Sequence, residues 1–276
     1  MEIINMMLCN DYINLNMKVM CDTVDQYENN PELQDAVHCS MERQYIVAHE
    51  DVIDIPKAEK CDTRVVVSGK RSFEAAKGYP GKKVAVLNFA NNHSVGGSPF
   101  KAGAQEESLC RCSTLYPCLE AMKRKFYDKH IYQYTRHEIN DMGNDDLIYT
   151  PDVVVFKTDE RTDPVFPKMM DREDWYMVDV ITCAAPQMSG RRAFPLDYES
   201  KIASRIKKIY DVAAKEHVDV LILGAWGCGA FGNSVDVVAR QFKSQLRNYD
   251  FGIIEFALAS RGDLSDNRFA QVLEKY

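Results

Sequence analysis

Residues Asn88 to Leu119 have the sequence NFANNHSVGGSPFKAGAQEESLCRCSTLYPCL, the clearest structural pattern in the chain. The apolar run Val84 to Leu87 comes directly before it and predicts a buried strand. A glycine-rich loop follows, and a helical pattern begins at Gln105. A strand, a loop with an exposed backbone and a helix N-terminus together bind anions, because free N–H groups point at the ligand. The stretch therefore predicts one half of a phosphate-binding site.

A second segment of the same kind lies about 130 residues downstream. The apolar run Val218 to Leu223 predicts another buried strand, and a helical pattern runs from about Ser234 to Leu246. Between them, four glycines in nine residues let the backbone approach a ligand closely and adopt positive φ. Two such units could hold one diphosphate from both sides. The candidate binding residues of this second loop are Gly224, Trp226, Gly227, Cys228, Gly229, Ala230 and Phe231.

The rest of the chain alternates between strand and helix patterns. The predicted strands cover residues 65–67, 84–89, 153–156, 177–183, 218–223 and 251–259. The predicted helices cover residues 73–79, 105–127 with a kink or division at Pro117, 200–215, 234–246 and the segment after 265. This alternation predicts an α/β domain with a largely parallel or mixed central sheet. Ligands of such sheets bind at the C-terminal ends of the strands, where both glycine loops fall.

Glu106 and Glu107 stand at the start of the helix that follows the first glycine loop. Acidic residues are common there simply because they complement the helix dipole. Their position at the edge of an anion-binding loop favours acid/base chemistry on a phosphate-bearing substrate instead. Because neighbours in sequence do not face the same way on a helix, we expect the two carboxylates to have different roles.

Composition excludes several other classes of function. The net charge of −7 argues against broad nucleic-acid binding, which needs a basic surface. No stretch of eighteen apolar residues exists, so we expect no membrane span. The sequence begins MEIINMMLCNDY, without the basic residues of a secretory signal, and a cytoplasmic location is expected.

The nine cysteines are an odd number, and several lie in apolar or helical contexts, so we expect reduced thiols. Cys110, Cys112 and Cys118 fall on one predicted helix with no second ligand pair nearby, which makes a poor zinc site. We therefore expect no metal.

The combination of NFAN, Gly-Gly and QEES with the distant GAWGCGAFGN resembles the microbial-type poly(ADP-ribose) glycohydrolase family. YTPDVVVF at residues 149–156 and the Ala-Ala-Pro at 184–186 fit the same family, over roughly residue 60 to the C-terminus. The resemblance implies an α/β macrodomain-like fold, with three layers and a mixed central sheet. We expect residues 61–276 to form this catalytic domain and residues 1–60 an N-terminal helical extension. That extension would serve as structural cover, or alternatively line the adenine end of the cleft.

The resemblance also implies roles for individual residues. Glu107 would act as general acid and then as general base, while Glu106 would hold ribose hydroxyls and tune its neighbour. Gln105 would position the loop and the ribose, Asn91 would hydrogen-bond the distal ribose, and Phe231 would lie against the ADP-ribose group. Trp226 is either a core residue or, beside four glycines, part of a ligand wall. The first loop would bind the diphosphate through Gly96, Gly97 and Ser98.

Ser98 departs from the three glycines that members of the family carry before QEE. A serine adopts positive φ less readily than glycine, and the following Pro99 has no N–H to donate. The lost glycine therefore bears on the conformation of the loop, and so on the rate, more than on the binding of an ADP-ribose group. If Ser98 strains the loop, Ser98→Gly should increase turnover or affinity.

The expected function is hydrolysis of the glycosidic bond at the distal ribose to release ADP-ribose, without a cofactor. The expected partners are ADP-ribose or its polymer on modified proteins, with no direct nucleic-acid or membrane binding. Three alternatives remain: a macrodomain reader that binds ADP-ribose without cleaving it, a hydrolase of a related ADP-ribosyl conjugate, and an NAD-using Rossmann enzyme. The last fits poorly, because neither loop has the G-x-G-x-x-G pattern.

Overall fold

A mixed sheet of seven strands lies at the centre of the computed structural model, which describes residues 2–55, 62–159, 167–260 and 262–274. The strands are β1 (Tyr45–Val47), β2 (Arg64–Ser68), β3 (Val84–Ala90), β4 (Leu147–Val155), β5 (Tyr176–Ala184), β6 (Val220–Leu223) and β7 (Ile253–Ala257). Their order across the sheet is β1-β4-β5-β3-β6-β7-β2. The pairs β1–β4 and β4–β5 are antiparallel and the others are parallel.

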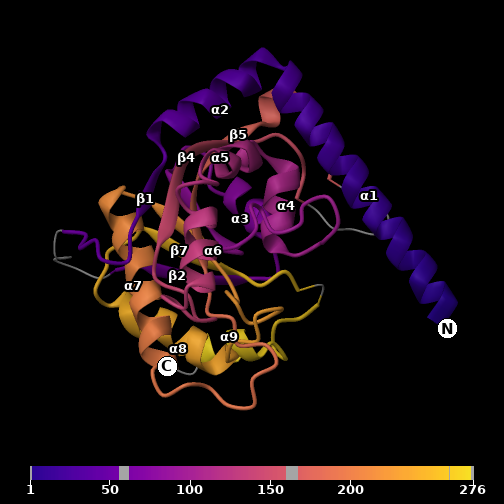
Figure 1. The fold of residues 1–276 in the computed structure, drawn as a ribbon. Coiled ribbons are helices and arrows are strands. Elements are labelled where there is room, and N and C mark those ends of the chain that lie inside the picture. The colour runs from indigo at the N-terminus through magenta and orange to yellow at the C-terminus, as the bar shows by residue number, and fades with distance from the viewer. Residues whose placement is uncertain (1, 56–61, 160–166, 261, 275–276) are drawn as a thin grey trace.

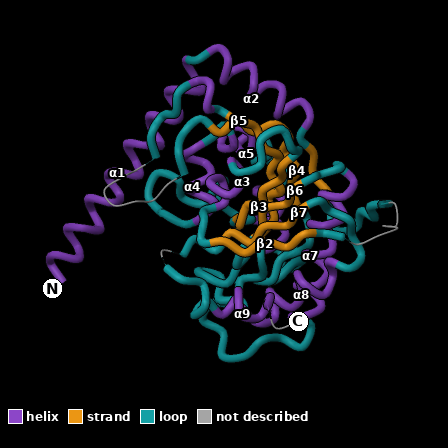
Figure 2. Tube along the Cα trace, turned by 180° about the vertical axis from the view of Figure 1, so that it is seen from behind, coloured by secondary structure: helices purple, strands orange, loops and turns teal. Residues whose placement is uncertain are grey.

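Helices cover both faces of this sheet (Figures 1 and 2). The helices are α1 (Glu2–Asn29), α2 (Pro31–Arg43), α3 (Ser72–Lys77), α4 (Gln105–Cys112), α5 (Leu115–Ala121), α6 (Tyr127–Thr135), α7 (Tyr198–Lys215), α8 (Val235–Leu246) and α9 (Arg268–Glu274), with a short 3-10 turn at Arg172–Asp174. One apolar cluster packs α7, α8 and α9 against one face of the sheet. A second cluster packs the helices α3, α4, α5 and α6 against the other face. The predicted three-layer α/β fold with a mixed sheet is confirmed.

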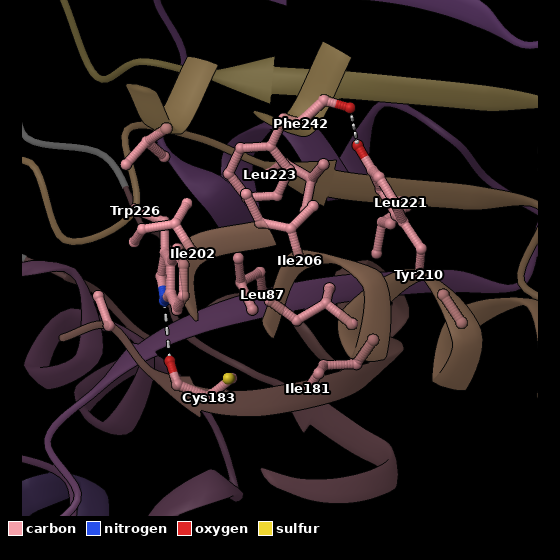
Figure 3. Packing of buried hydrophobic residues seen from close by; sticks show 14 of the residues in the cluster. Leu87, Ile181, Cys183, Ile202, Ile206, Tyr210, Leu221, Leu223, Trp226 and Phe242 are labelled. Atoms are coloured by element: carbon pink, nitrogen blue, oxygen red, sulfur yellow. Dashed lines mark hydrogen bonds between the residues drawn. The ribbon is translucent and has the colours of Figure 1, made fainter. Parts of the chain in front are cut away.

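The first half of strand β3 is apolar throughout because both of its faces are buried. Ala85 and Leu87 belong to the cluster under α7 and α8, whereas Val84 and Val86 belong to the cluster on the other face. A central strand that is buried on both faces has no polar side to alternate with. Figure 3 shows Leu87 packed among residues of α7 and the neighbouring strands.

The helical pattern over residues 105–127 was expected to kink or divide at Pro117, and this position is wrong. Helix α4 ends at Cys112 and α5 begins at Leu115, so the break comes before Pro117. At the break, the N–H of Thr114 donates to the carbonyl of Val154, and the N–H of Val154 donates to the Thr114 hydroxyl. Pro117 lies in the first turn of α5, where a missing N–H leaves no helical hydrogen bond unmade.

The N-terminal segment consists of α1, α2 and the strand β1. Helix α2 packs on β4 and α5, and the first turns of α1 extend away from the rest of the chain (Figure 1). β1 pairs with β4 in the register Tyr45 opposite Tyr149, so the segment expected to be a helical extension also supplies one edge strand of the main sheet. Among the described residues, no helix has the length and apolar content needed to cross a membrane.

Candidate active site

A cavity of about 450 Å³ lies where β3, β5 and β6 end. It is lined by Phe89, Ala90, Asn91, Gly97, Ala104, Gln105, Glu106, Glu107, Ala185, Ala225, Trp226, Gly227, Gly229, Ala230 and Phe231. The two glycine-rich segments, far apart in sequence, therefore form opposite parts of one cavity. They meet because β3 and β6 are parallel neighbours, which brings the loops after them to the same edge of the sheet.

Ten of the fourteen predicted site residues line this cavity. The other four lie in the same two loops but do not line it: Gly96, Ser98, Gly224 and Cys228. Sequence reasoning missed five lining residues, which are Phe89, Ala90, Ala104, Ala185 and Ala225. Ala90, Ala104 and Ala225 are directly adjacent to predicted positions, while Phe89 and Ala185 lie within one residue of the ends of β3 and β5. The strand end at Ala184-Ala185 was the signal that could have identified Ala185.

Glu106 is almost fully buried and is held by β3 and the loop after it. Its Oε2 accepts a hydrogen bond from the backbone N–H of Asn91 at 2.8 Å, and its Oε1 accepts one from Nδ2 of Asn88 at 3.2 Å. Burial raises the pKa of Glu106 to about 8, and the adjacent Glu107 carboxyl contributes, against the opposing hydrogen bonds from Asn91 and Asn88. A neutral carboxyl in this position can donate a hydrogen bond to a ligand hydroxyl.

The two carboxyl oxygens of Glu107 differ in their hydrogen bonding. Oε1 accepts a hydrogen bond from the backbone N–H of Ser98 at 3.1 Å, while the buried Oε2 has no hydrogen-bond partner within the described residues. A buried carboxyl oxygen without a partner is costly, so such an atom marks a place where a ligand or water completes the structure. Oε2 of Glu107 is therefore available to exchange a proton with a substrate or water in the cavity.

Gln105 holds the end of β3 through its side chain. Its Oε1 accepts from the N–H of Phe89 at 2.9 Å, and its Nε2 donates to the carbonyl of Leu87 at 2.8 Å and to the hydroxyl of Ser72 at 3.0 Å. The amide is therefore engaged with protein groups at both ends. The expected contribution to loop position agrees with this geometry, and the second lone pair of Oε1 is the part of this amide that could still accept from a ribose hydroxyl.

Asn91 shapes the loop after β3 with its side-chain oxygen. Its Oδ1 accepts from the N–H groups of His93 at 2.8 Å and Ser94 at 3.0 Å, which is the usual way that asparagine forms a turn. The Nδ2 group is the part of this side chain that can donate to a ligand in the cavity.

The first glycine loop has positive φ at Gly96 (61°) and Gly97 (68°). A Cβ on Gly97 would lie 2.4 Å from Oε1 of Glu107, and one on Gly96 would lie 2.9 Å from Sγ of Cys110. Both positions therefore require glycine for conformation and for space. Ser98 is absent from the described residues with positive φ, so the strain expected at this position does not arise. Its N–H contributes to the site through Glu107.

The second glycine loop is fixed against the end of β5. Nδ2 of Asn233 donates to the carbonyls of Pro186 and Gly227 at 2.8 and 3.0 Å. Trp226 is fully buried, and its Nε1 donates to the carbonyl of Cys183 at 2.9 Å (Figure 3). The indole belongs to the core cluster, while Phe231 is only partly buried and stands at the cavity.

Within the described residues, one group has the composition of a metal site: His49, Glu50 and Asp146, whose ligand atoms lie within 4.8 Å of one another. None of them lines the cavity. The Lys129 ammonium lies 3.1 Å from the Asp146 carboxylate and supplies the positive charge that a metal would bring. The absence of a metal stays a prediction.

Comparison with known proteins agrees with this geometry. The family model for the catalytic domain of microbial-type PARG, poly(ADP-ribose) glycohydrolase, matches residues 20–158, which is half of the chain. The chain belongs to this family. The matched range includes the first glycine loop and both glutamates, so the family assignment covers the candidate acid/base centre. As a member of the microbial-type PARG family, the chain is a glycosidase that cleaves the glycosidic bond at the distal ribose and releases ADP-ribose.

Solved structures of microbial PARG extend the likeness over the second glycine loop. PARG from Thermomonospora curvata bound to the inhibitor ADP-HPD superposes with a TM-score of 0.76 at 28% identity, covering 95% of this chain and 99% of that one. PARG from Deinococcus radiodurans in complex with ADP-ribose gives a TM-score of 0.72 at 27% identity, covering 87% and 97%. A comparison with curated protein sequences gives no match. The predicted macrodomain-like fold is confirmed.

Proposed function

We propose that the cavity described above hydrolyses ADP-ribose polymer with Glu107 as the group that transfers the proton. The observation that carries this assignment is the buried Oε2 of Glu107, which has no hydrogen-bond partner among the described residues and stands in a cavity bordered by two glycine loops. The neighbouring oxygen is fixed by Ser98, so the free one is presented in a defined direction.

The diphosphate would be held by backbone N–H groups of the loops around Gly97 and Gly227. Both glycines have positive φ and lie where a Cβ would collide with a neighbouring side chain, so the backbone can approach an anion closely at these positions. The net charge of −7 is no obstacle, because backbone dipoles bind anions without lysine or arginine. Glu106 and Nδ2 of Asn91 would bind the hydroxyls of the distal ribose.

Hydrolysis then needs one carboxyl that works in both directions. A protonated Glu107 donates its proton to the departing oxygen as the bond from that oxygen to C1″ breaks. Positive charge develops on the ribose, and the adjacent diphosphate stabilises it. The Glu107 carboxylate then accepts a proton from water as the water oxygen bonds to C1″, which regenerates the acid and leaves free ADP-ribose.

We further infer that the polymer is carried on modified proteins in the cytoplasm, and that neither nucleic acid nor membrane is a partner. The acidic net charge supports the exclusion of nucleic acid. Seven cysteines are free thiols in the described part of the chain, which supports a reducing compartment. They are Cys21, Cys39, Cys110, Cys112, Cys118, Cys183 and Cys228.

The experiment is to incubate the purified protein with ADP-ribose polymer and, in parallel, with a mono-ADP-ribosylated protein, and to quantify free ADP-ribose. Wild type should release ADP-ribose from the polymer. Glu107→Gln should reduce that rate by about 10²–10⁴, while binding ADP-ribose within a few-fold of wild type. Equal cleavage by this variant would remove Glu107 from the proton transfer. Binding without any release by wild type would identify a reader.

A further inference from the structure

Helix α1 contacts the segment that leads into the catalytic helix. Asn16 of α1 is 3% exposed, and its Nδ2 donates to the carbonyls of Lys101 at 3.0 Å and Ala102 at 3.2 Å. These carbonyls belong to the loop from Ser98 to Ala104, which connects the first glycine pair to α4. One side chain from the start of the sequence thus holds two consecutive peptide groups of a loop about 85 residues away.

Arg111 holds the same loop from the α4 side. Its Nη1 donates to the carbonyls of Pro99 and Ala102, each at 2.7 Å, and the guanidinium is almost fully buried. Within the loop, the N–H groups of Lys101 and Ala102 both donate to the carbonyl of Ser98. The carbonyl of Ala102 therefore accepts from both Asn16 and Arg111, and these hydrogen bonds fix the loop between α1 and α4.

Both ends of this loop reach the catalytic carboxylates. At its first residue, Ser98, the N–H donates to Oε1 of Glu107. At its last residue, Ala104, the loop lines the cavity and forms the N-cap position of the helix that begins QEE. A shift of the loop therefore moves a hydrogen-bond donor of Glu107 and the start of the helix together.

The remaining contacts of α1 make its position well defined. The hydroxyl of Thr23 donates to the carbonyl of Arg111 at 2.6 Å. Nζ of Lys157, which is 1% exposed, donates to the carbonyl of Val19 at 3.1 Å and to the Thr23 hydroxyl at 2.7 Å. Hydrogen bonds depend on direction far more than apolar contacts do, so α1 is held in one register against α4.

We propose that Asn16 is a positioning residue for glycoside hydrolysis, holding the Ser98–Ala104 loop so that Glu107 keeps its catalytic orientation. The inference rests on the proposed role of Glu107. It gives the N-terminal helix a part in the reaction beyond covering the domain. Displacements of about 1 Å at a reacting group can slow an enzyme by up to about 10², so loss of two loop contacts should affect kcat.

The test measures kcat and KM on ADP-ribose polymer, ADP-ribose affinity and melting temperature for Asn16→Ala and Asn16→Asp. Asn16→Ala should lower kcat roughly tenfold, with ADP-ribose affinity within about threefold of wild type. Asn16→Asp keeps the size but replaces the donor with an acceptor that faces two carbonyls, so it should lower kcat at least as much. Asn14→Ala, an exposed asparagine on the same helix, is the matched control.

Leu33→Ala separates positioning from stability, because Leu33 is fully buried in α2, away from the Ser98–Ala104 loop. At an equal loss of melting temperature it should retain a higher kcat than Asn16→Ala. An unchanged kcat in Asn16→Ala, or a loss that Leu33→Ala reproduces, would overturn the proposal. Wild type and Glu107→Gln are run beside them: if wild type cleaves and Glu107→Gln does not, the proposed function stands whatever the Asn16 variants show.

Discussion

The backbone N–H of Ser98 donates to Oε1 of Glu107 over 3.1 Å, which ties the first glycine loop to the helix that follows it. The loop must pass so close to the carboxylate that no side chain fits at Gly97, where a Cβ would lie 2.4 Å from the same oxygen. The geometry of the loop and the orientation of Glu107 are therefore set together.

Gly97→Ala should abolish most of the activity. The added Cβ would collide with Glu107, and the φ of 68° is unfavourable for alanine, so the loop or the carboxylate must move. We expect kcat on the polymer to fall by about 10². Gly81→Ala is the matched control, since Gly81 has φ 74° and a Cβ added there would have no described atom within 4 Å outside its own chain neighbours. It carries the same backbone strain without the collision. Equal losses in both variants would show that strain alone is responsible.

The raised pKa of Glu106 makes stability depend on pH. Its folded-state pKa of about 8 is above the ordinary value of 4.5, so the folded state binds this proton more tightly than the unfolded state does. The resulting stabilisation is complete below about pH 4.5 and is lost as the pH rises through about 8. Glu106→Gln removes this titration. The difference in unfolding free energy, Glu106→Gln minus wild type, should therefore increase between pH 5 and pH 9, as measured by urea denaturation. A constant difference would mean that Glu106 ionises normally.

Ser98→Gly should leave kcat within about twofold of wild type. Because Ser98 does not have positive φ, glycine relieves no strain there, and the N–H that binds Glu107 is kept. Ser98→Ala should behave in the same way. Polymer cleavage rates of the two variants check this. A several-fold gain in Ser98→Gly alone would restore the idea that the serine strains the loop.

The parts of the fold that local pattern determines were predicted from sequence. Strands β3 and β6 are buried on both faces and so give continuous apolar runs, and glycines beside them, such as Gly97 and Gly227, occupy positions where a Cβ would collide with a neighbour. The meeting of the two glycine loops in one cavity was predictable as well, because parallel strands end at the same edge of a sheet.

Features that depend on distant contacts were not predictable. The break between α4 and α5 depends on hydrogen bonds between Thr114 and Val154, forty residues away. The short strand at Tyr45–Val47 continues a helical spacing of apolar residues and becomes a strand only by pairing with β4. The burial of Trp226 depends on the carbonyl of Cys183, which its sequence neighbours do not reveal.

Gln105→Glu tests whether this side chain serves the protein or the ligand. The carboxylate can still accept from Phe89, but it cannot donate to the carbonyl of Leu87, which is left facing a negative charge. We expect the unfolding free energy at pH 8 to fall by about 1–3 kcal/mol. The deficit should shrink near pH 5, because a protonated carboxyl can donate to Leu87 again. Gln34→Glu is the control for the added charge in an exposed setting, because Nε2 of Gln34, on the exposed face of α2, also donates to a backbone carbonyl, that of Glu28. A variant with wild-type stability but weaker ADP-ribose binding would show that Gln105 contacts the ribose instead.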